Sequence, residues 1–499
     1  MPLEHLDVLI VGAGLSGIGA GYHIQTRCPG RSYAIFEGRS SMGGTWDLFR
    51  YPGVRSDSDM YTLGYRFQPW RNAKAIADGP SILSYIRDTA HEYGIDRKIR
   101  FEHRVRRASW SSRDAQWTVD VEVGPSKELS RITCGFIYLC TGYYDYESGY
   151  TPEFRGVERF HGPVIHPQKW PENLDYASKR VVVIGSGATA VTLVPAMARA
   201  AAHVTMLQRS PTYVVNLPSQ DKIGTWLRNH LPERTAYMMT RWKNVFLQMF
   251  FYGLARGNPD YFKKMVSKGV SKSLGPGYDL RHFTPSYNPW DQRLCLVPDS
   301  DLFEAIRSGR ASVVTDQIDT FTERGIRLES GVELEADIVV TATGLNLKLM
   351  SGLQLVVDDK PVDMSKTMAY KGMMFSDIPN LASAFGYTNA SWTLKCDLTS
   401  EYVCRLLDHM ERNGFAQCTP RRNDPSVVAE PVLSFSSGYV QRAISTLPSQ
   451  GSRTPWRLHQ NYALDLIGVR LSSVEDGVME FKRSARRPSQ RRQSAEAPR

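Results

Sequence analysis

Two glycine-rich turns, each directly after a short apolar run, constrain the fold of this chain more than any other feature. The first turn follows residues 8–11 and the second follows residues 181–184. An apolar strand that passes through such a turn into a helix begins a βαβ unit whose helix N-terminus faces a bound phosphate. Two such units predict an α/β protein with two Rossmann-like dinucleotide-binding domains.

The first turn has the pattern Gly-x-Gly-x-x-Gly at Gly12, Gly14 and Gly17. We expect Gly12 to make the sharp turn, Gly14 to let the backbone approach the pyrophosphate, and Gly17 to let the helix pack on the strand. The next apolar run, residues 32–36, ends in Glu37, twenty residues after Gly17. A carboxylate there binds both ribose hydroxyls and repels a 2′-phosphate, so the ligand of the first turn should be FAD or NAD.

The second turn reads Gly-x-Gly-x-x-Ala, and the strand after it ends in a different residue type. Its predicted cofactor contacts are Gly185, Ser186, Gly187, Ala188, Thr189 and Ala190. Where the first unit has an acid, this unit has Arg209, flanked by Gln208 and Ser210 as further contacts. A guanidinium pairs well with a phosphate, so the second turn should take NADP(H) rather than NAD(H). The alternative is that Arg209 is an unpaired surface residue.

A chain of 499 residues is too long for one small core, which predicts two or three packed domains. We expect a discontinuous FAD-binding domain formed by residues 1–150 and 341–480. An NADP-binding domain should occupy residues 151–340, with a helical insertion at about residues 215–290. Residues 481–499 are rich in Pro, Ser, Gln and Arg, which predicts a basic disordered tail.

The net charge of +10 does not by itself indicate a nucleic-acid partner, because six of the ten charges lie between Lys482 and Arg499. No apolar run is long enough to span a bilayer, and the first strand begins too close to Met1 to leave room for a signal peptide. The seven cysteines are scattered and form no Cys-x-x-Cys pair. This usage predicts a reduced, cytoplasmic protein without a disulfide framework or a cysteine-bound metal.

The loop after the first unit carries a more specific pattern. Gly43-Gly-Thr-Trp46, followed by Tyr51-Pro-Gly53 and Asp57, resembles the flavin-binding stretch of class B flavoprotein monooxygenases. The resemblance implies that the first turn takes FAD, with the backbone of Val105, in a strand over residues 100–106, at the adenine. The residues that it implies near the flavin are Ser16, Thr45, Trp46, Asp47 and Asp57.

The segment between the two units adds a second resemblance. Phe160-x-Gly162-x-x-x-His166-x-x-x-Trp170-Pro171 resembles the fingerprint of Baeyer–Villiger monooxygenases, and the heteroatom-oxidising group usually has Tyr or Phe at the place of Trp170. Pro167 departs from the threonine that many members have. The alternatives are a buried histidine whose hydrogen bonds are satisfied locally and an ordinary linker between domains.

By the same resemblance, Arg293 matches the arginine that stabilises the flavin peroxide anion in Baeyer–Villiger enzymes, with Asp57 to orient it. Among these enzymes the chain is most similar to the ethionamide-activating group. The implied activity uses NADPH and O₂ to convert ketones to esters or lactones through a C4a-peroxyflavin, and extends to sulfides or thioamides. The alternatives are a heteroatom-oxidising flavin monooxygenase, a non-catalytic flavin-binding redox sensor, and a structural ion pair between Arg293 and Asp57. A disulfide reductase is disfavoured, because it needs a cysteine pair.

Two aromatic features leave their roles open. The insertion carries Trp226, Trp242, Phe246 and Phe250 at helical spacing, which is typical of packing but also suits a cover over an apolar substrate or a peripheral membrane contact. Trp456 lies in a segment that resembles the one folding over bound nicotinamide, so it is a candidate for stacking there.

Overall fold

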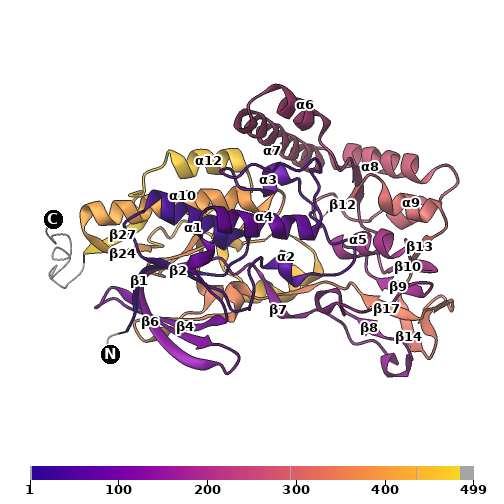
Figure 1. Cartoon of the computed structure of the whole chain (residues 1–499), viewed down its shortest axis with the longest axis horizontal. Helices are drawn as coiled ribbons and strands as arrows, with labels where there is room; N and C mark the ends of the chain where they lie inside the picture. The colour runs from indigo at the N-terminus through magenta and orange to yellow at the C-terminus, as the bar shows by residue number, and fades with distance from the viewer. Residues whose placement is uncertain (1–2, 293, 434, 484–499) are drawn as a thin grey trace.

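The computed structural model describes residues 3–292, 294–433 and 435–483. The chain forms two lobes side by side (Figure 1). The first lobe contains the indigo N-terminal part and the orange and yellow C-terminal part, and the second lobe contains the middle of the chain. Arg293 and residues 484–499 lie outside the described residues.

The first lobe is built on a nine-stranded sheet with the order β20-β19-β4-β5-β6-β1-β2-β3, in which β23 pairs with β6. The strands β1, β2, β3, β6 and β23 are mutually parallel where they pair, as a Rossmann unit requires. Their bounds are β1 His5–Val11, β2 Tyr33–Phe36, β3 Ile99–Arg100, β4 His103–Ser111, β5 Gln116–Val123, β6 Glu128–Leu139, β19 Gln354–Val357, β20 Lys360–Pro361 and β23 Leu381–Ser383.

Helices from both ends of the chain cover this sheet. Their bounds are α1 Leu15–Arg27, α2 Thr45–Leu48, α3 Met60–Leu63, α4 Gly79–Glu92, α10 Trp392–Asn413, α11 Gly438–Ala443 and α12 Tyr462–Arg470. Short strands complete the lobe: β21 Ala369–Tyr370, β22 Met374–Phe375, β24 Phe415–Pro420, β25 Ala429–Pro431, β26 Ser449–Gly451 and β27 Met479–Arg483. The prediction of a single strand over residues 100–106 is wrong. The extended backbone is interrupted between β3 and β4, where Glu102 has φ +55°.

The second lobe has a five-stranded, all-parallel sheet with the order β13-β10-β9-β17-β8. Its elements are β8 Val164–Ile165, β9 Arg180–Ile184, α5 Ala188–Met197, β10 His203–Gln208, α9 Asp301–Arg307, β13 Ala311–Thr315 and β17 Ile338–Thr341. A small antiparallel sheet, β14 Ile318–Thr322, β15 Gly325–Leu328 and β16 Glu333–Glu335, lies beside it. Both lobes therefore confirm the predicted α/β class with two Rossmann-like units.

In the described part of the chain, three α-helices and a short 3₁₀ helix (Leu280–Phe283) stand between β11 (Val214–Leu217) and its parallel partner β12 (Cys295–Pro298). The α-helices are α6 Lys222–His230, α7 Glu233–Gly257 and α8 Pro259–Leu274. The α7 helix reaches the first lobe, where the buried guanidinium of Arg241 donates to the carbonyl oxygens of Tyr61 and Gly64 at 2.7 Å each. The α8 helix packs on the second lobe through Phe262 and Val266. The insertion therefore bridges both lobes.

The chain passes between the lobes twice, and the two passages are paired. β7 (Tyr144–Gly149) leads out of the first lobe, and β18 (Leu345–Leu347) returns to it antiparallel to β7. The amide of Tyr150 also donates to the carbonyl oxygen of Gly344 at 3.0 Å. The two covalent connections between the lobes therefore run as one two-stranded ribbon.

The basic tail expected from residue 481 needs a correction. Residues 481–483 belong to β27, which pairs with β24, so the tail starts no earlier than residue 484 and lies outside the described residues. None of the helices in the described ranges is long and apolar enough to cross a membrane.

Candidate functional site

The first glycine-rich turn is closed by contacts that exclude side chains. Gly12 has φ +105°, and a Cβ there would lie 2.6 Å from the carbonyl oxygen of Cys140. A Cβ on Gly17 would lie 1.8 Å from the carbonyl oxygen of Gly12, so the start of α1 sits directly on the turn. A Cβ on Gly14 would lie 3.5 Å from the Cα of Gly44. A Cβ is therefore excluded at Gly12 and Gly17, whereas at Gly14 it would make an ordinary contact with Gly44. Such a turn fits a dinucleotide pyrophosphate lying against the backbone.

Glu37 lies directly after β2 and is buried beside the turn. Its carboxylate accepts the backbone N–H of Ala13 at 2.8 Å and that of Arg39 at 3.0 Å. Burial raises the pKa of this carboxyl group, and the two backbone hydrogen bonds oppose the shift. The backbone carbonyl oxygen of Glu37 also accepts the N–H of His103 at 2.9 Å, which brings the start of β4 next to Glu37. Val105 follows two residues later in β4.

An open cavity of about 250 Å³ lies between the first turn and the second lobe. From the first lobe it is lined by Gly14, Ser16, Thr45, Trp46 and Asp57, which are all residues predicted near the flavin or its pyrophosphate. From the second lobe it is lined by Ala188 and Thr192 of α5 and by Leu296 of β12. The two lobes therefore contribute to one cavity, as two cofactors that exchange electrons would require.

Asp47, also predicted near the flavin, does not line this cavity. Its carboxylate is buried and accepts hydrogen bonds from Ser41 at 2.5 Å, from Arg39 at 2.8 Å and from Arg87 at 3.2 Å. These bonds fix the start of α2, so Asp47 positions Thr45 and Trp46 through the backbone.

Several cavity residues were missed by the sequence interpretation. Tyr143, Tyr144 and Tyr146 line the cavity and follow the Cys-Thr-Gly turn at the end of β6, so their place after a strand end was a usable signal. Tyr144 donates from its hydroxyl to Oγ1 of Thr45. Trp392, at the start of α10, donates its indole N–H to Ser16 Oγ at 2.9 Å. No local pattern could reveal that contact, since the two residues are far apart in the sequence.

In the second turn, the first glycine leaves no room for a Cβ, whereas the second glycine faces open space. Gly185 has φ +132°, and a Cβ there would lie 2.3 Å from the carbonyl oxygen of Ala342. No atom lies within 4 Å of the place where a Cβ on Gly187 would stand. Gly187 caps the N-terminus of α5, so free backbone N–H groups face open space, which suits a phosphate.

Some side chains around the second turn are exposed, and others are buried or held by hydrogen bonds. Arg209 and Ser210 are exposed after β10, and no ion pair of Arg209 is found among the described residues. Ser186 Oγ lies 2.7 Å from Oγ1 of Thr212, Thr189 bonds with Tyr51 of the flavin loop, and Ala190 is fully buried under the turn. The free guanidinium at the end of β10 fits the recognition of a 2′-phosphate.

Gln208 does not have the expected place beside this turn. Its side chain is buried, and its amide nitrogen donates to the carbonyl oxygen of His282 at 2.7 Å and to Thr315 Oγ1 at 2.8 Å. It points away from Arg209 because successive side chains of a strand alternate between faces. Gln208 therefore ties β10 to its neighbours rather than contacting a cofactor.

Asp57 lies on the cavity wall, and Arg293, its expected partner, lies outside the described residues. The loop that carries Asp57 is held against the second lobe by an ion pair between Arg55 and Asp301, the first residue of α9. Leu296 reaches the same cavity three residues after Arg293.

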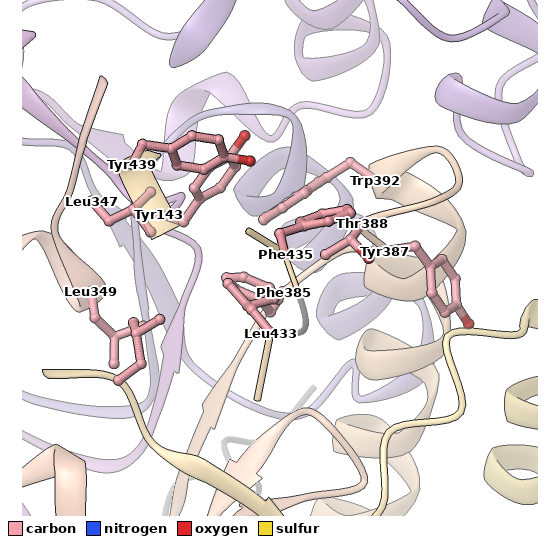
Figure 2. A pocket seen from close by; sticks show the side chains of 11 residues that line it. Tyr143, Leu347, Leu349, Phe385, Tyr387, Thr388, Trp392, Leu433, Phe435 and Tyr439 are labelled. Carbon is pink, nitrogen blue, oxygen red and sulfur yellow. The ribbon is translucent and has the colours of Figure 1, made fainter. Parts of the chain in front are cut away.

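A smaller apolar chamber shares Tyr143, Tyr387 and Trp392 with this cavity, and Figure 2 shows the side chains that face it. The rings of Tyr143 and Trp392 are stacked with centroids 5.2 Å apart, and Phe385 tilts against Trp392 at 5.2 Å. The other side chains of the chamber are Leu347, Leu349, Thr388, Leu433, Phe435, Tyr439 and Leu447. We call this space the aromatic chamber.

Trp456 is not available for the expected nicotinamide stacking. Its indole is 2% exposed, belongs to the core of the first lobe and packs edge-on against Tyr370. The segment resembles one that folds over bound nicotinamide, but the indole of Trp456 faces the core of the first lobe.

Comparison with known proteins decides the family. The flavin-binding monooxygenase-like family matches residues 75–378, which is more than half of the chain, and an NAD(P)-binding Rossmann-like domain matches residues 10–76. The chain belongs to the flavin-binding monooxygenase-like family. This assignment confirms the predicted pairing of a flavin with a nicotinamide dinucleotide and makes the protein a flavin monooxygenase of class B.

Relatives place this flavin-binding monooxygenase-like chain within the family. It is 57% identical to the FAD-containing monooxygenase EthA of Mycobacterium tuberculosis over 97% of this chain and 99% of that protein. It is 50% identical to the putative FAD-containing monooxygenase MymA of the same organism over 97% of this chain and 98% of that protein. The predicted similarity to the ethionamide-activating group is confirmed.

A solved structure agrees on the fold of this flavin-binding monooxygenase-like chain. An oxidized steroid monooxygenase bound to NADP superposes with a TM-score of 0.75 at 20% identity, over 96% of this chain and all of that chain.

Proposed function

We propose that the protein is a Baeyer–Villiger monooxygenase that uses FAD, NADPH and O₂ to convert ketones to esters or lactones and that also oxidises sulfides or thioamides. The observation that carries the proposal is the cavity shared by both glycine-rich turns, with Asp57 on one wall and α5 on the other. The fingerprint with Trp170 and the resemblance of Arg293 favour this group over enzymes that oxidise only nitrogen or sulfur. FAD and NADP appear in the names of its relatives and neighbours.

The flavin, when bound, supplies the oxygen-transfer chemistry that no amino-acid side chain offers. The chain supplies position and charge. Gly12, Gly14 and the N-terminus of α1 would bind the FAD pyrophosphate, and Glu37 would accept the ribose hydroxyls in place of its present backbone donors. Thr45 and Trp46, fixed by the bonds to Asp47, would flank the flavin.

NADPH would lie on the second turn, with its pyrophosphate at Gly187 and its 2′-phosphate at Arg209 and Ser210. Arg293 would hold negative charge that develops beside the flavin, because a guanidinium stays charged and donates in a planar fork. Asp57 would orient that guanidinium.

The aromatic chamber is our proposed site for the apolar part of the substrate. Its side chains are aliphatic or aromatic apart from Thr388 and the hydroxyl groups of its tyrosines (Figure 2). Trp392 lines both the chamber and the cavity. The chamber has a volume of about 30 Å³, so it would take the end of an apolar group only as its walls adjust, and its apolar lining would exclude water from the reacting carbonyl group. It therefore supports ketones with an apolar chain or ring as the substrate class.

We also propose a reducing, cytoplasmic setting, which is supported by the seven cysteines: all are buried free thiols.

The deciding experiment supplies ¹⁸O₂ and NADPH to the purified holoenzyme with a cyclic ketone in one reaction and an aryl methyl sulfide in another. We expect one labelled oxygen in a lactone as well as in a sulfoxide. Labelled sulfoxide without any lactone would assign the protein to the heteroatom-oxidising group. NADPH consumption without a labelled product from either compound would support the redox-sensor alternative.

A further inference from the structure

The three helices of the insertion expose many large apolar side chains. We define the insertion face by Trp226, Met239, Phe246, Leu247, Phe250 and Tyr261, which come from α6, α7 and α8. Trp226 is 58% exposed, Phe246 57% and Phe250 63%. In Figure 1, α6 and α7 stand above the body of the molecule, and α8 lies on the same upper side. Large exposed apolar side chains gathered on three successive helices indicate an interaction site.

The packing of α7 on the first lobe does not account for this face. The side chains that hold α7 in place are Arg241, Asn244 and Val245, which are buried on the opposite side of the helix. Met239, Phe246 and Phe250 follow one another at intervals of seven and four residues, so they form one outward stripe. A water-facing stripe of a helix is normally polar, and here it is apolar.

The charged residues near this stripe indicate what kind of partner the insertion face binds. Residues 222–274 contain ten lysines and arginines and only two acids, Glu233 and Asp260. Of the ten cationic side chains, Arg241 is buried, and Lys243, Arg256 and Lys263 form ion pairs with acids of the chain. Lys264 and Lys268 on α8 are exposed beside Met265. Aromatic and aliphatic side chains flanked by lysines and arginines are the composition of helices that lie in a membrane interface.

We propose that the insertion face docks on the surface of a membrane that contains anionic phospholipids. The apolar stripe of α7, with Trp226 of α6, inserts at the boundary between headgroups and acyl chains, while the lysines and arginines meet lipid phosphates. A second copy of this chain is a poorer occupant, because an isologous contact would place like charges opposite each other. The helices lie on the bilayer, in keeping with the absence of a spanning helix among the described residues.

The test is a flotation assay of the full-length holoenzyme with vesicles of phosphatidylcholine mixed equally with phosphatidylglycerol. We expect the protein to float with these vesicles and to be released by high salt, and to float much less with vesicles of phosphatidylcholine alone. The F246E/F250E double variant should partition at least about tenfold more weakly, since each phenyl ring loses its apolar transfer.

The matched control is Leu129→Glu, which changes a 77% exposed leucine of β6 in the first lobe and should leave flotation unchanged. NADPH oxidation without vesicles should be the same in all variants, which shows that they are folded. A wild type that does not float with anionic vesicles overturns the proposal. Concentration-dependent dimers lost in F246E/F250E, without flotation, would assign the face to a second copy instead.

Discussion

The imidazole of His166 donates from Nε2 to the carbonyl oxygen of Gly344 at 3.1 Å, and its ring lies where a Cβ on Gly149 would stand. Gly149 and Gly344 belong to the two passages between the lobes. The ring Nδ1 accepts the N–H of Gln168 at 3.2 Å, so both nitrogens of the neutral imidazole have a hydrogen-bond partner. The fingerprint histidine therefore holds the joint between the lobes and lies outside the lining of the cofactor cavity.

This contact predicts a pH dependence of stability. Burial lowers the pKa of His166, against an opposing effect of the bond to Gly344. As pH falls, His166 therefore takes up a proton more readily in the unfolded chain than in the folded one. Its contribution to the free energy of unfolding is complete above the ordinary pKa of about 6.5 and is lost as pH falls below that value. We expect the free energy of unfolding, measured in urea from pH 8 to about pH 5, to fall less steeply in His166→Gln than in the wild type. Parallel curves would contradict this role.

The two glycines of the second turn should respond differently to the same substitution. Gly185→Ala should destabilise the protein by about 2 kcal/mol or more, because of the positive φ and the contact with Ala342. Gly187→Ala should keep the stability within about 0.5 kcal/mol, since its Cβ meets nothing, but should weaken NADPH binding. Thermal unfolding and nucleotide titration measure both effects. Unchanged NADPH affinity in Gly187→Ala would mean that the phosphates lie elsewhere.

Arg209 should determine the choice between the two nicotinamide nucleotides. In Arg209→Gln, the KM for NADPH should rise about tenfold or more, while the KM for NADH stays the same. Arg199→Gln is the matched control, because Arg199 is an exposed arginine just beyond the other end of α5. Both KM values are measured by absorbance during turnover. Equal changes in the KM for NADPH and for NADH would show that Arg209 does not recognise the 2′-phosphate.

The aromatic chamber should set the size of the accepted ketone. Phe435→Ala removes a ring from its wall, so the ratio of kcat/KM for a bulky ketone to that for a small one should rise about fivefold or more. Phe415→Ala, which removes a ring stacked on Phe481 outside the chamber lining, controls for general loss of packing. The same ratio in Phe435→Ala and the wild type would place the substrate outside the chamber.

The parts of this structure that the sequence predicts well are those set by local sterics. Gly12 and Gly185 have φ of +105° and +132°, a backbone conformation that favours glycine, and the Gly-x-Gly pattern marks both positions within a few consecutive residues. Contacts between distant segments are different: nothing local marks Trp392 as the partner of Ser16.

The wrong predictions concern which way a side chain faces. Gln208 has the right place in the sequence but the wrong face of its strand, and Trp456 is turned into the core of the first lobe. Tertiary packing decides both orientations, and resemblance to a motif does not contain that information.

The ribbon of β7 and β18 has a consequence for the history of such chains. The second lobe leaves and re-enters the first at neighbouring points, with the amide of Tyr150 bonded to Gly344. A module inserted between adjacent ends can be exchanged without cutting through the host sheet. Recombination at this ribbon exchanges the reductant-binding lobe of a flavin scaffold, and a chimaera with the lobe of a relative is therefore cut at residues 149 and 345. The new lobe must keep the contacts of α7 with the first lobe, where Arg241 bonds to Tyr61 and Gly64.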